Sequence, residues 1–74
     1  MSEVEIEIRR GVDTRAWGLR LGIRALRENA VLLGVRDPEA DAPEVLTLHV
    51  GDVAEVAGRR FSVLEIRPDS VIVK

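Results

Sequence analysis

The chain has 74 residues, of which 46% are hydrophobic and 32% charged, with a formal net charge of −2 at pH 7. This length predicts one domain, residues 1–74, whose core contributes no more than roughly 3–5 kcal/mol. The absence of cysteine and the single histidine exclude disulfides and a zinc cluster within one chain. Self-association is the remaining means of stabilisation, so we expect a homo-oligomer.

The first predicted strand begins near the N-terminus. Val4, Ile6 and Ile8 alternate with charged residues, which is the period of two of a half-buried strand. This segment lacks the basic and apolar regions of a signal peptide, and no apolar run in the chain is long enough to cross a membrane. We therefore expect a cytoplasmic protein with no membrane contact.

A β-hairpin is predicted next. A short strand over residues 12–17 precedes Gly18-Leu19, which fits a type II′ turn because glycine tolerates the positive φ at its first central position. This turn would place Ala16 opposite Leu21 in the following strand. The alternation slips in that strand between positions 23 and 26, and again between 63 and 66, which indicates a β-bulge at each place.

The chain matches itself at an offset of forty residues, in both turn and core positions. Glycines and arginines coincide in the two halves: Gly11 with Gly51, Gly18 with Gly58, Arg20 with Arg60, and Arg27 with Arg67. The repeats are residues 4–35 and 45–74, joined by an acidic, proline-containing connector, residues 36–44. We predict an all-β fold, a small closed barrel or a two-sheet sandwich built from two similar four-stranded meanders.

Charge is spread unevenly along the chain. Residues 1–36 carry seven arginines against five acids, whereas residues 37–74 carry four basic groups against eight acids. The two halves therefore have opposite net charge and are expected to attract one another between chains. The acids of the connector do not satisfy a calcium loop, because Ala42 and Leu48 stand where that loop needs glycine and glutamate.

An apolar patch is predicted on the outer faces of the strands. Val53, Leu64, Ile72 and Leu32 fall on the outward phase, where polar residues are expected. One interpretation is an interface with another subunit or protein partner. The alternative is that strong coiling of the sheet buries these residues inside the chain.

A second candidate surface combines arginine with an aromatic side chain. Arg15, Trp17, Arg20 and Arg24 share the outward phase of the first hairpin, a combination typical of small β-barrels that bind nucleic acid strands. The alternative is a local cation–π pair between Trp17 and Arg20.

The residues available for catalysis are few. His49 has no motif with a serine or threonine nucleophile around it. Asp52 and Glu65 are predicted to lie roughly opposite each other at the open end of a hairpin, as two solvated acids. We therefore expect no enzyme activity, no cofactor and no metal.

Several segments, Val4–Gly11, Gly18–Leu26, Val50–Asp52 and Gly58–Ile66, resemble those of small uncharacterised all-β proteins of actinobacteria. The second half is more distantly similar to the small β-domain of type II secretion and pilus inner-membrane proteins. The first resemblance implies an all-β fold and carries no activity. We expect a non-enzymatic protein-interaction or assembly module that self-associates. The alternative is a nucleic-acid-binding small β-barrel, and a third possibility is a small-molecule pocket or enzyme between the sheets.

Overall fold

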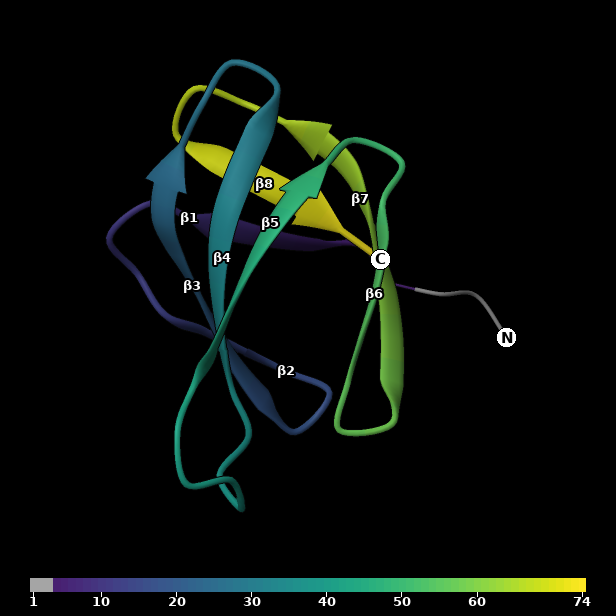
Figure 1. Cartoon of the computed structure of the whole chain (residues 1–74). Coiled ribbons are helices and arrows are strands. Elements are labelled where there is room, and N and C mark those ends of the chain that lie inside the picture. Colours follow the sequence, from purple (N-terminus) through teal and green to yellow (C-terminus); the bar gives the residue numbers. More distant parts are fainter. Residues whose placement is uncertain (1–3) are drawn as a thin grey trace.

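A computed structural model describes residues 4–74, which form eight β-strands and no helix (Figure 1). The strands are β1 (Ile6–Arg9), β2 (Thr14–Ala16), β3 (Leu19–Leu26), β4 (Ala30–Arg36), β5 (Glu44–His49), β6 (Val53–Val56), β7 (Arg59–Ile66) and β8 (Ser70–Val73). The predicted all-β class is confirmed.

The strands form two four-stranded antiparallel sheets. Sheet I has the order β2-β3-β4-β5, and sheet II has the order β1-β8-β7-β6. Each sheet has two open edges, β2 and β5 in sheet I and β1 and β6 in sheet II. The closed-barrel alternative is therefore wrong, and the chain folds as two sheets around a shared core.

Two glycine corners carry the chain from one sheet to the other. Gly11 and Gly51 have φ angles of 82° and 92°, a region that glycine adopts without steric cost. At each corner a turn is closed by a backbone hydrogen bond, Val12 N to Arg9 O at 3.2 Å and Asp52 N to His49 O at 3.0 Å. The chain therefore leaves sheet II after β1 and returns to it after β5.

This crossing changes the predicted composition of the sheets. The sequence predicted one meander from residues 4–35 and a second from 45–74, but β1 pairs with β8 and β5 pairs with β4. Each sheet thus contains three strands of one half and the first strand of the other. The prediction of two separate four-stranded meanders is wrong, because the glycine corners direct β1 and β2 into different sheets.

The hairpin turns also differ from the prediction. The loop is Trp17-Gly18, with φ of 54° and 77°, and positive φ at both central residues is the type I′ geometry that matches the twist of the strands. Thr14 therefore lies opposite Leu21, where the predicted register placed Ala16. A shift of two residues leaves the side chains of β2 and β3 on their predicted faces.

Local features of the two halves correspond at the predicted offset. The register shifts between Ile23 and Ala25 in β3 and between Val63 and Glu65 in β7, which confirms the predicted bulges. Ala57-Gly58 has the same positive φ pair as the first hairpin. An origin of the chain by duplication stays a prediction.

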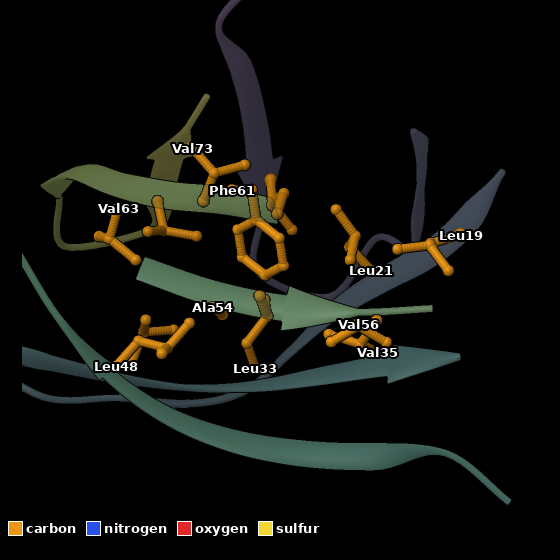
Figure 2. Close-up of a cluster of buried hydrophobic side chains, with 13 residues drawn as sticks. Leu19, Leu21, Leu33, Val35, Leu48, Ala54, Val56, Phe61, Val63 and Val73 are labelled. Carbon is orange, nitrogen blue, oxygen red and sulfur yellow. The ribbon is translucent and has the colours of Figure 1, made fainter. Parts of the chain in front are cut away.

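The core lies between the sheets and takes side chains from both (Figure 2). Phe61 of β7 lies in the middle of this cluster and is 1% exposed. Its largest fully buried members are Phe61, Ile8, Leu21, Leu33, Val31, Val35, Val63, Val71 and Val73. Because these residues use the inner faces, the outer faces are left free for polar groups.

We predict that Phe61→Ala unfolds the protein at 25 °C. Truncation of a buried phenylalanine costs about 3–5 kcal/mol, which is comparable to the whole stability of a core this small. Urea unfolding followed by circular dichroism measures the stability of the variant and of the wild type.

Leu64→Ala is the control for this experiment. Leu64 lies on the same strand as Phe61 but is 39% exposed, so its truncation should shift the urea midpoint little. A folded Phe61→Ala protein with an unchanged midpoint would contradict the central position of Phe61 in the core.

Candidate functional site

A row of three arginines crosses the outer face of sheet I. Arg15 of β2 lies directly opposite Arg20 of β3, which lies opposite Arg36 of β4. Residues that are directly opposite in antiparallel strands share a face, so the three side chains project together. All three are exposed.

Two glycines form the floor beside this row. Gly22 of β3 pairs with Gly34 of β4, one step further along the same face. An open depression of about 350 Å³ lies here, lined by the glycines and by the charged side chains around them. A Cβ on Gly22 would lie 2.6 Å from the Asp13 carboxylate, and one on Gly34 would lie 2.9 Å from Arg24 Nε. The side chains of Asp13 and Arg24 thus lie over the glycines.

Four side chains define what we call the arginine face: Arg15, Arg20, Arg24 and Arg36. Within residues 4–74, no ion pair or hydrogen bond engages any of the four guanidinium groups. In contrast, other arginines of the chain pair with glutamates, namely Arg9, Arg60 and Arg67. The arginine face therefore concentrates four cations without ion-pair partners in the part of the chain that the structure describes, with the single carboxylate of Asp13 beside them.

The connector between β4 and β5 borders the arginine face. Pro43 lines the glycine-floored depression, and Pro38 lines a neighbouring one beside Arg20 and Arg36. The connector and the first residue of β5 carry four acids, Asp37, Glu39, Asp41 and Glu44. None of these carboxylates forms an ion pair within the described part of the chain. Figure 1 shows the connector as the teal loop that extends below the sheets.

The structure brings together three of the four residues predicted to contact nucleic acid, Arg15, Arg20 and Arg24, and separates Trp17 from them. The Trp17 ring stacks on Phe61 with centroids 5.5 Å apart, and Arg59 lies over it at 4.5 Å. The predicted pair of Trp17 with Arg20 is therefore wrong. Trp17 packs against the core and is partly buried.

Sequence reasoning missed Arg36 and the paired glycines. Arg36 ends a strand in which Leu33 and Val35 are buried, so strict alternation places it on the outer face. The same alternation would have found Gly34. Their opposition to Arg20 and Gly22 depends on the register of β3 with β4, which the bulge obscures.

The predicted apolar interface residues lie on both sheets. Val53 and Leu64 of sheet II are exposed, at 60% and 39%. Ile72 of the same sheet is 8% exposed, and Leu32 lies half-buried on the outer face of sheet I. The four residues therefore do not form one patch across neighbouring strands, because Leu32 belongs to sheet I and the other three belong to sheet II.

An ion-pair network flanks Ile72. Glu7 and Glu65 lie opposite Ile72 on its two neighbouring strands. Arg67 joins them, with its Nη1 3.5 Å from Glu7 and its Nε donating a hydrogen bond to Glu65. This hydrogen bond raises the pKa of Arg67. Arg67 thus links the two glutamates that lie on either side of Ile72.

A histidine–aspartate contact occupies the corner between β5 and β6. Asp52 Oδ2 accepts a hydrogen bond of 2.8 Å from the His49 backbone N–H and lies 3.3 Å from His49 Nδ1. Both hydrogen bonds lower the pKa of Asp52, and the one from the His49 backbone has the larger effect. Asp52 and Glu65, predicted to be neighbours, thus have different partners, His49 and Arg67.

Residues 4–74 meet neither the requirements of a metal cluster nor those of a membrane-spanning helix. No group of three or more histidine, cysteine, aspartate or glutamate side chains is arranged there to hold a metal ion. No helix in this range is long and apolar enough to cross a membrane.

No protein-family model, curated protein or solved structure matches the chain. The resemblance to actinobacterial and secretion proteins therefore stays a prediction.

We predict that Asp52→Asn lowers stability at neutral pH and that this effect becomes smaller in acid. A carboxylate whose folded pKa lies below its ordinary value of 3.8 stabilises the fold above that value. Its contribution is lost as pH falls through the lower folded pKa. Urea midpoints at about pH 7 and about pH 3 measure the difference.

Asp69→Asn is the control for this experiment, because Asp69 is an exposed turn acid whose carboxylate makes no ion pair in the described residues. An Asp52→Asn effect of equal size at both pH values would contradict a role for the carboxylate charge.

Proposed function

We propose that the protein is a non-enzymatic interaction module that binds an acidic protein segment on the arginine face. One observation carries this proposal: four guanidinium groups lie on one sheet face, and none has a partner within residues 4–74. Arginine presents a planar fork of donors that matches a carboxylate in two-point geometry. An incoming carboxylate also relieves the repulsion among these cations.

The depression beside the arginines offers an acceptor as well as donors. The Asp13 and Arg24 side chains lie over Gly22 and Gly34, so a ligand meets these side chains and not the glycine backbone. The Asp13 carboxylate can accept a hydrogen bond from a backbone N–H of the ligand. The face therefore offers both donors for carboxylates and an acceptor for a peptide group.

A protein segment fits this surface better than a nucleic acid strand. Binding of single strands combines positive charge with aromatic stacking platforms. The two aromatic residues, Trp17 and Phe61, instead stack on each other at the core.

We predict that Arg20→Ala/Arg36→Ala weakens binding of a glutamate-rich peptide by at least about tenfold, which corresponds to about 1.4 kcal/mol. The loss of two charge-assisted contacts is the reason. Fluorescence anisotropy with a labelled peptide at low salt measures the affinity. Binding by the wild type should weaken as salt rises, because the contacts are exposed.

Arg10→Ala/Arg27→Ala is the matched control, because it removes the same charge from turns outside the arginine face. An equal loss of peptide affinity in the two double variants would show that net charge alone attracts the peptide, and would overturn the proposed site. Tighter binding of single-stranded DNA than of the peptide, lost in Arg20→Ala/Arg36→Ala, would assign the face to nucleic acid instead.

A further inference from the structure

We propose that the acidic segment bound on the arginine face is the connector of a second copy of this chain, so that the protein is a two-fold symmetric dimer. This inference rests on the proposed function and names its partner. It commits to residues 37–44 as the ligand, with Glu39 and Asp41 at the centre of the acidic segment. Both are exposed.

Charge complementarity supports this partner. The arginine face carries four cations and the connector four carboxylates, and within residues 4–74 neither set forms ion pairs. Among the described residues, the arginine face therefore lacks carboxylate partners, which the connector supplies, and the connector lacks cationic partners, which the arginine face supplies. Paired in an interface partly removed from water, such charges attract more strongly than they do when separately solvated.

The position of the two surfaces explains why the partner is a second copy. Pro38 and Pro43 border the depressions of the arginine face, so the connector and the face lie side by side. A two-fold axis through their boundary places each connector on the other copy's face. Both contacts then form at once, as an isologous interface requires.

Hydrogen bonds within the connector hold its exposed turn in one conformation. Asp37 Oδ1 accepts a 3.0 Å hydrogen bond from the Glu39 N–H, and Asp37 O accepts one of 2.9 Å from the Ala40 N–H. These bonds and the two prolines restrict the loop before binding, which lowers the entropy lost when it docks.

A charge-swap experiment tests the dimer. Arg20→Glu/Arg36→Glu places like charges against the partner's connector, and Glu39→Lys/Asp41→Lys places like charges against the partner's face. Each variant alone is expected to be monomeric. An equimolar mixture is expected to form a heterodimer, because a contact between the two altered surfaces is again complementary, as is the contact between the two unaltered ones. Asp37 is left unchanged because it holds the turn.

Size exclusion with light scattering and sedimentation equilibrium at low salt measure the masses. The wild type is expected to be a dimer whose dissociation constant rises at least about tenfold at high salt. Glu28→Lys/Asp69→Lys has the same charge change on exposed turn residues and is expected to remain dimeric. A dimer of Glu39→Lys/Asp41→Lys, or a mixture that stays monomeric, would overturn the inference.

Peptide binding separates failure of this inference from failure of the proposed function. A monomeric wild type that binds the glutamate-rich peptide through Arg20 and Arg36 would overturn the dimer and leave the proposed function standing. A monomeric wild type that binds no peptide would overturn both. If the dimer exists, Glu39→Lys/Asp41→Lys should bind the peptide more tightly than Glu28→Lys/Asp69→Lys, because its face is vacant.

Discussion

The glycine corners between β1 and β2 and between β5 and β6 are the constraint on which the architecture depends. Positive φ at Gly11 and Gly51 turns the chain out of one sheet and into the other. Each sheet is therefore completed by a strand from the opposite half, and neither half can bury its apolar face alone. One shared core, centred on Phe61, follows from this exchange.

The division between an inner and an outer face makes room for the arginine face. On β3 and β4 the inner positions are filled by fully buried residues such as Leu21, Leu33 and Val35. The alternate positions take no part in the core, so Arg20, Arg36 and two glycines can occupy them without loss of packing. In the proposed function, stability and binding therefore depend on opposite faces of the same strands.

Local patterns predicted much of this fold, because alternation, glycine turns and bulges each act within a few residues. The strands and both bulges were found in this way. The set of strands in each sheet was not predicted, because the pairing of β1 with β8 joins segments at opposite ends of the chain and leaves no local signal. Three arginines of the face were identified from their phase, whereas Arg36 and the opposition of Gly22 to Gly34 required the register across the bulge. Trp17 was misplaced because its stacking on Phe61 is a contact between sheets.

The net charge of −2 conceals a surface on which opposite charges are separated rather than mixed. Exposed ion pairs within a chain contribute little, about 0–1 kcal/mol each, so there is little gain in folding the connector back onto the arginine face. In the proposed dimer the same charges act in two contacts at once, which offsets the entropy lost on association, and the turn in the connector reduces the further entropy lost when the connector docks. The proposed association would add stability to a core limited by the length of the chain, and would link the small size of the fold to the charge on its outer face.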